Sequence, residues 1–152
     1  MKLLLLIILS TYYYTNSQEY DIKNVREFRL GAEYYFEYTE DKELKSCLEN
    51  SDNFNTLGMN ACIGNSIRKW YNKLDSTFTK IMISLPDDMK PSFEKQQSDW
   101  ALYKDTEMEF SNKLYRLRGG TFSTSAILIN ELKLVRKRCI DLDILYQSLF
   151  QN

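Results

Sequence analysis

The residues best suited to chemistry lie in one short stretch of the chain, residues 97–105. This stretch combines an amide, two aromatic rings, a cation and an acid, in the order Gln97, Trp100, Tyr103, Lys104 and Asp105. Spacings of three to five residues bring side chains to one side of a helix. An acid, a base and two aromatics so close together could form a polar binding or catalytic site.

Catalysis is nevertheless not what the residue types favour. The chain has no histidine, which removes the commonest general base and the commonest metal ligand. The carboxylates that a glycosidase could use, Asp99, Asp105 and Glu107, fall on different faces of one helix. The sequence also lacks a nucleophile motif and a set of cysteine and histidine ligands. It therefore predicts a protein that is not an enzyme and that uses no metal or other cofactor.

Residues 1–17 have the pattern of an export signal. A single positive charge at Lys2 precedes an apolar run from Leu3, and small residues at Thr15 and Ser17 fit a cleavage site before Gln18. The apolar run is too short to span a bilayer, and the alternative is a core helix at the N-terminus. We expect a cleaved signal peptide, a periplasmic or secreted protein, and no stable membrane anchor after cleavage.

Composition restricts the classes of protein to which the chain can belong. The 20 basic and 21 acidic residues give a net charge of −1, which excludes a generally basic nucleic-acid-binding protein. Aromatic residues make up 14% of the chain, while only 5 glycines and 2 prolines interrupt it. Few helix breakers and many helix-forming residues predict an all-α protein.

Apolar residues recur every three or four positions in three long segments. The clearest helix covers residues 59–85 and ends at Pro86. A second helix begins near Asp87 or Pro91 and ends before Gly119, and a third covers residues 123–149. One or two short helices are expected in residues 18–46, ending in a turn around residues 39–41. These segments predict an antiparallel bundle of three long helices with one or two short N-terminal helices.

The three cysteines fall into two groups. Cys47 and Cys62 flank a polar segment, so a disulfide between them would close a short loop. Cys139 lies on the apolar stripe of the third long helix. It is either a small core residue with an inert, free thiol or the site of an intermolecular disulfide.

Several short motifs, in order, carry a family resemblance. They are Met59-Asn60-Ala61-Cys62, the stretch with Gln97, Trp100, Tyr103 and Asp105, then Gly119-Gly120-Thr121, and last Arg138 with Leu142. In this order and spacing, residues 47–149 resemble the LprI-type lysozyme-inhibitor domain, a small exported helical module. Residues 18–46 would then be an N-terminal extension.

The chain departs from the family pattern at three places. Lys104 stands where the family usually has arginine, and the aspartate-leucine stretch near Leu74 is weak. The family often carries two further cysteines, at the positions of Met108 and Asn130 in this chain. Their joint absence is expected if they normally bond each other. The resemblance implies that the remaining pair, Cys47 and Cys62, still forms its own bridge.

The motif residues have a mainly structural interpretation. Trp100 and Tyr103 are expected to be core aromatics, and Gln97 to connect two helices or a helix and a loop through hydrogen bonds. Lys104 and Asp105 are either solvated or, in the case of Asp105, paired with Arg138 across the bundle. The stretch as a whole would then be an internal contact surface of the bundle.

The resemblance implies an exported protein that inhibits lysozyme by occluding its cleft. Lysozymes are cationic and use two carboxylates in that cleft. The best candidate for a protruding loop is 115–122, whose partner-binding candidates are Arg116, Arg118, Gly119, Gly120 and Phe122. An ordinary interhelical loop is the alternative for this segment. The alternative function is a structural or interaction module of the bacterial cell envelope that has a different protein partner.

Overall fold

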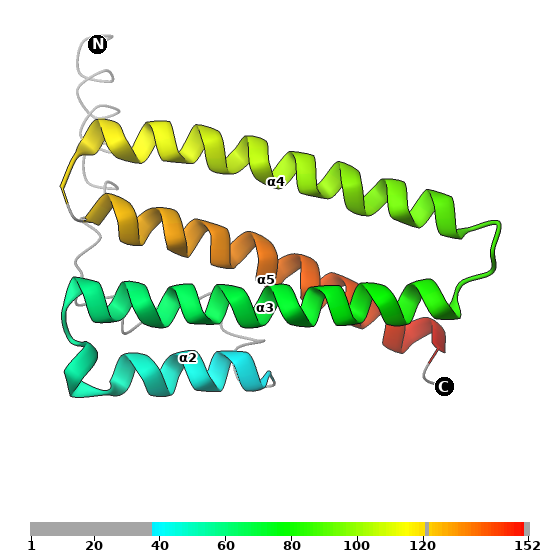
Figure 1. The fold of residues 1–152 in the computed structure, drawn as a ribbon, viewed down its shortest axis with the longest axis horizontal. Coiled ribbons are helices and arrows are strands. Elements are labelled where there is room, and N and C mark those ends of the chain that lie inside the picture. The colour runs from blue at the N-terminus through cyan, green and yellow to red at the C-terminus, as the bar shows by residue number, and fades with distance from the viewer. Residues whose placement is uncertain (1–37, 121, 151–152) are drawn as a thin grey trace, which may run out of the picture. The chain divides into compact units, whose positions relative to one another are not determined.

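The computed structural model describes residues 38–120 and 122–150, and these residues form helices (Figure 1). They are α2 (Thr39–Glu49), the short 3-10 helix η2 (Ser51–Asn53), α3 (Thr56–Ser84), α4 (Lys90–Arg118) and α5 (Phe122–Phe150). The all-α class is confirmed for this part of the chain. The predicted signal peptide and the first twenty residues of the predicted extension, 18–37, lie outside the described residues.

Local signals in the sequence explain where the long helices begin and end. The side chain of Asn55 accepts a hydrogen bond from the backbone N–H of Gly58 at 2.8 Å and so caps the start of α3. Pro86 follows the end of α3, and Pro91 lies in the first turn of α4. Gly119 ends α4 with a φ of 68°. Each long helix therefore ends close to the predicted position.

The N-terminal helix α2 differs from the prediction. Residues 39–41 were expected to form a turn, which is wrong, because Thr39 begins a helix that continues to Glu49. Glu40 and Asp41 lie in its first turn, where carboxylates interact favourably with the positive end of the helix dipole. The helix also crosses the expected boundary between extension and domain at residues 46 and 47.

The helices run in alternating directions along the chain, and specific side-chain contacts join neighbouring helices. Consecutive helices run in opposite directions, while α3 and α5 run the same way and make the most extensive contact (Figure 1). The antiparallel neighbours are joined by the pairs Cys47–Cys62, Phe78–Phe93 and Gln97–Arg138. The parallel pair is joined by Asn60–Ser125 and Tyr71–Glu131.

The core lies mainly between α3 and α5. Trp70 and Leu74 from α3 pack with Val135 and Leu142 from α5, and all four are fully or almost fully buried. Cys139 belongs to the same cluster, and its side chain is 0% exposed. Phe93 brings α4 onto this core by stacking on Phe78, with 5.1 Å between the ring centroids.

A buried ion pair attaches α2 to the α3–α5 core. The guanidinium of Arg136 donates hydrogen bonds to both carboxylate oxygens of Asp41, with the shortest from Nε to Oδ1 at 2.9 Å and from Nη2 to Oδ2 at 2.7 Å. It also lies over the ring of Trp70, 5.4 Å from the centroid. Two parallel bonds fix the orientation as well as the position of α2.

Helix α4 is less covered than the sequence indicated. Phe93 is buried and Trp100 is half-buried against the core, but Tyr103 is exposed, so the predicted internal surface is wrong at this residue. Phe110 and Leu114, farther along α4, are exposed as well. Three residues along a helix correspond to a rotation of about 300°, which is about 60° less than a full turn. The side chain of Tyr103 therefore points about 60° away from that of Trp100 and leaves the buried face. Among the described residues, no helix is long and apolar enough to cross a membrane.

Candidate functional site

The motif around Trp100 connects α4 to α5. Arg138 donates a hydrogen bond from Nε to Oε1 of Gln97 at 2.9 Å, and a second from Nη2 to Oε1 of Gln96 at 3.2 Å. Its guanidinium also lies over the indole ring of Trp100, 5.7 Å from the centroid. Burial lowers the pKa of Arg138, although the nearby Asp141 opposes this shift. Gln97 thus makes the helix-to-helix connection expected of it.

Lys104 forms a polar contact that joins three helices. Its Nζ donates to the hydroxyl of Tyr71 at 3.0 Å, and that hydroxyl donates to Oε1 of Glu131 at 3.2 Å. Burial raises the pKa of Tyr71. Burial alone would lower the pKa of Lys104, but its hydrogen bonds to Tyr71 and Asp105 outweigh this effect and raise it. The ammonium therefore remains charged and bonded at neutral pH.

The other two motif residues face solvent. Asp105 pairs with the adjacent Lys104 at 2.9 Å rather than with Arg138, and its carboxylate is largely exposed. Tyr103 is more than half exposed, so the expectation of a core aromatic is wrong for Tyr103. Most of the motif thus makes contacts that hold α4 in place, and the acid of the motif contacts only Lys104 among the motif's polar residues.

The segment 115–122 is a tight helix-to-helix turn rather than a protruding loop. Tyr115 to Arg118 are the last turn of α4, which leaves only residues 119–121 between the helices. Gly119 and Gly120 both have positive φ, 68° and 79°. The hydroxyl of Ser123 donates to the backbone oxygens of Tyr115 and Gly119, each at 2.9 Å. These bonds satisfy carbonyls at the end of α4 and fix the turn.

The five partner-binding candidates therefore lie at the end of α4, in the turn that follows it and at the start of α5. Arg116 is exposed on the last turn of α4, and both glycines are exposed at the apex. Arg118 is the last residue of α4 and Phe122 is the first of α5; their side chains lie outside the described part of the structure. We call the surface formed by Arg116, Gly119 and Gly120 the hairpin tip.

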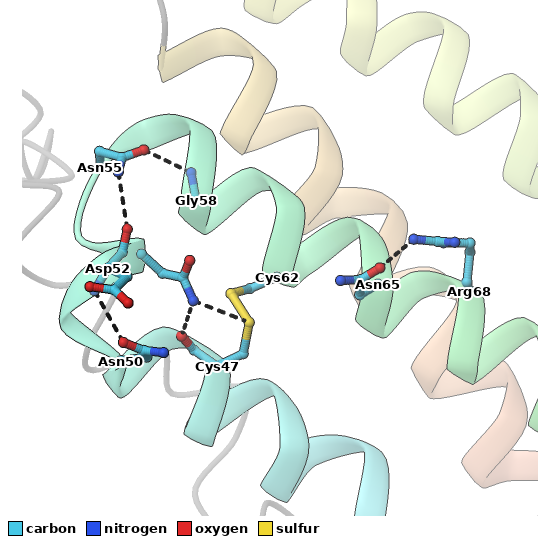
Figure 2. Close-up of a disulfide and its surroundings, with 9 residues drawn as sticks. Cys47, Asn50, Asp52, Asn55, Gly58, Cys62, Asn65 and Arg68 are labelled. Atoms are coloured by element: carbon cyan, nitrogen blue, oxygen red, sulfur yellow. Dashed lines mark hydrogen bonds between the residues drawn. A yellow bond between two sulfur atoms is a disulfide. The ribbon is translucent and has the colours of Figure 1, made fainter.

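The disulfide lies at the same end of the bundle as the hairpin tip (Figures 1 and 2). Cys47 and Cys62 are bonded, which joins the end of α2 to the second turn of α3. Asn53, in the connection between them, donates from Nδ2 to the backbone oxygen of Cys47 at 2.9 Å. The hydrogen bond from Ser125 to Asn60, at 2.7 Å, joins the first turns of α5 and α3. The end of the bundle is thus held by one covalent and several polar contacts.

Gly58 is a close-packing position at this end. A Cβ added to it would lie 2.6 Å from the Cα of Asn53, closer than real Cβ atoms approach a backbone. A glycine at this position therefore lets the connection between the cysteines pack against the first turn of α3.

The described residues contain no group of three or more histidine, cysteine or carboxylate side chains able to hold a metal ion. Cys139 is a free, buried cysteine, and burial raises the pKa of its thiol to about 12. A thiol with such a pKa is not a nucleophile at neutral pH.

The family model for the lysozyme inhibitor LprI matches residues 47–142. The chain belongs to the LprI lysozyme-inhibitor family. The match begins at Cys47 and ends at Leu142, so the LprI region contains the disulfide, α3, α4 and most of α5. No curated protein matches the chain.

An LprI-like fold also occurs in a solved structure. The crystal structure of an uncharacterized protein from Burkholderia thailandensis is similar, with a TM-score of 0.69 and 21% sequence identity. The similarity covers 75% of this chain and 56% of that protein, so the chain spans little more than half of its length. At this identity the likeness concerns the fold alone.

Sequence reasoning missed three residues that hold the LprI fold together here. Asp41 and Arg136 form the buried pair although they are separated by 95 positions, and no local pattern relates them. Asp41 also precedes the LprI match. Gly58 gave a weak signal, since an isolated glycine near a helix start can mark a close contact.

Proposed function

We propose that this protein is an exported lysozyme inhibitor and that the hairpin tip blocks the substrate cleft of the lysozyme. Membership of the LprI family carries the proposal. Residues 1–17 would direct export, so the protein would act in the periplasm or outside the cell. Its role would be binding rather than catalysis, and lysozyme would be its protein partner.

The shape and charge of the hairpin tip support this mode of binding. Gly119 and Gly120 are exposed at the apex of the turn and carry no side chains, so their backbone could enter a cleft that binds a polysaccharide chain. Arg116 is exposed beside the apex and can bring its guanidinium to one of the two catalytic carboxylates. Occlusion of those carboxylates would stop hydrolysis.

A cell-wall lysis assay tests the activity directly. The purified exported protein is added to lysozyme and a cell-wall suspension, and inhibition is expected at about micromolar concentration or below. An unchanged lysis rate at about tens of micromolar protein would remove the proposal.

A matched pair of variants tests the location of the site. Arg116→Glu should weaken inhibition by about tenfold or more, because it replaces an attractive charge by a repulsive one. Lys80→Glu makes the same change of charge on an exposed residue of α3, nearer the other end of the bundle, and should leave inhibition unchanged. Equal losses in both variants would show that net charge matters and the hairpin tip does not.

The alternative is an interaction module of the cell envelope with another protein partner. The exposed apolar residues of α4 favour it, since they offer a contact surface that extends along the helix beyond the hairpin tip. Capture from an envelope extract distinguishes the two functions. Recovery of a defined envelope protein, together with no effect on lysis, would favour the alternative.

A further inference from the structure

The exposed side of α4 carries an apolar stripe that lysozyme inhibition by the hairpin tip does not use. The stripe consists of Tyr103, Phe110, Leu114 and Leu117, and each of these side chains is more than half exposed. Tyr103, Phe110 and Leu117 are seven residues apart, a spacing that keeps side chains along one side of a helix. Large apolar side chains in a continuous exposed row indicate a surface that binds another protein.

Two charged residues beside the stripe differ in sign on either side of its middle. Glu109 precedes Phe110 and Lys113 follows it, and both are exposed. A step of four residues places them along the same side of α4. Glu109 and Lys113 pair within the helix at 2.6 Å, but an exposed pair of this kind contributes little and can exchange partners.

A second copy of α4 complements this pattern when it runs antiparallel. With a two-fold axis beside Phe110, Tyr103 lies opposite Leu117 of the partner subunit. Glu109 then lies near Lys113 of the partner subunit. A parallel two-fold arrangement would instead place this flank of the two helices on opposite sides of the interface, so the acid of one copy would not meet the base of the other. A surface that matches itself about a two-fold axis is the basis of an isologous dimer.

We propose that the protein forms an antiparallel homodimer through the apolar stripe of α4. The dimer leaves the fold of each subunit intact, because Phe93, Trp100 and Lys104 hold a different, adjacent side of α4 against α3 and α5. It does not depend on lysozyme binding, and its tests are separate.

Light scattering after size-exclusion chromatography measures the association. The purified exported protein at about 100 µM should show twice the molar mass of one chain and dissociate on dilution. Phe110→Asp should raise the dissociation constant at least about tenfold, since it places a charge at the centre of the interface. Ile83→Asp changes an equally exposed apolar residue of α3, 77% exposed against 63% for Phe110, and should leave the constant unchanged.

Two further measurements keep the result independent of the folding of one variant. Glu109→Lys and Lys113→Glu should each weaken the dimer several-fold, and the double variant should restore it. Phe110→Cys lies beside the two-fold axis, so a short thiol cross-linker should join two chains, because packed helix axes lie about 8–10 Å apart. Ile83→Cys should give no cross-linked dimer.

A protein that remains monomeric at all concentrations would overturn the proposal, because some other occupant must then cover the stripe. A dimer that withstands Phe110→Asp, or that cross-links through Ile83→Cys, would also overturn it.

Discussion

The side-chain amide of Asn130 lies 3.8 Å from the sulfur of Met108 and donates a 2.9 Å hydrogen bond to Ser111. This contact joins α5 to α4 at the two positions where the sequence resemblance places a pair of cysteines in other LprI domains. Met108 and Asn130 are therefore spatial neighbours, as expected of residues that stand in place of a bonded pair. Polar and van der Waals contacts hold the two helices together here without a covalent bond.

A disulfide introduced at this contact should stabilise the protein. In Met108→Cys/Asn130→Cys the sulfurs should bond and restrict a segment with a sequence separation of 22 residues. The chain-entropy estimate for such a loop is about 3 kcal/mol of unfolding free energy. Denaturant unfolding with and without reductant measures the gain, and each single variant serves as a control. Two free thiols in the double variant under oxidising conditions would contradict the prediction.

Removal of the buried carboxylate of Asp41 should destabilise the protein strongly. Asp41→Ala leaves the buried guanidinium of Arg136 without its main partner, which typically costs about 3–5 kcal/mol. Glu43→Ala is the matched control on the same helix, because Glu43 pairs with Lys69 in an exposed bridge, and such bridges contribute about 1 kcal/mol or less. Urea unfolding curves of the two variants compare them. Similar losses in both would show that the Asp41–Arg136 pair has no special role.

The two helical glycines of α3 should respond in opposite directions to alanine. Gly58→Ala places a Cβ against the backbone of Asn53 and should destabilise the protein by more than 1 kcal/mol, about the range for overpacked sites. Gly64→Ala meets nothing within 4 Å and should stabilise α3 by about 0.5–1 kcal/mol. Thermal unfolding monitored by circular dichroism distinguishes them, and a stabilising Gly58→Ala would contradict the close contact.

The free energy of unfolding should be lower at alkaline pH than at neutral or mildly acidic pH. The pKa of Cys139 is raised from 9.0 to about 12 by burial, so its contribution to stability is complete below pH 9 and is lost as pH rises toward 12. The raised pKa values of Tyr71 and Lys104 act in the same direction, because the folded state retains both protons longer than the unfolded state. Unfolding free energies measured between about pH 8 and 11 should therefore decline.

The variant Cys139→Ala isolates the thiol in the alkaline experiment. It should lower stability at pH 8, because it leaves a cavity, but its decline above pH 9 should be shallower. A wild-type protein with constant stability to pH 11, or identical slopes in both proteins, would contradict the assignment.

Periodic features were predictable from the sequence because they depend on neighbouring residues. The apolar steps of α3, the stop at Pro86 and the positive φ of Gly119 all follow from local chemistry. The helical class and the long-helix boundaries depend on the same local signals.

Features that depend on a distant partner were not predictable. The helix at residues 39–49 is held by Arg136, which is far away in sequence, so residues 39–41 read as a turn. Tyr103 follows Trp100 on the apolar pattern, yet its side chain is more than half exposed. The alternative of a pair between Asp105 and Arg138 is wrong for the same reason. Asp105 pairs with its neighbour Lys104, while Arg138 donates hydrogen bonds to Gln96 and Gln97. Amphipathic spacing identifies an apolar stripe but not which part of it another helix will cover.

The burial of Cys139 bears on how the chain acquires its single bridge during folding. Three cysteines allow three different bridges, and an oxidising compartment would permit any of them in an unfolded chain. Cys47 and Cys62 are separated by 15 residues and meet sooner than either meets Cys139, because short loops close fastest. Once α5 packs on α3, the third thiol is sealed from oxidants and from exchange with the finished bridge. Short loop closure and core packing therefore both favour the Cys47–Cys62 pairing.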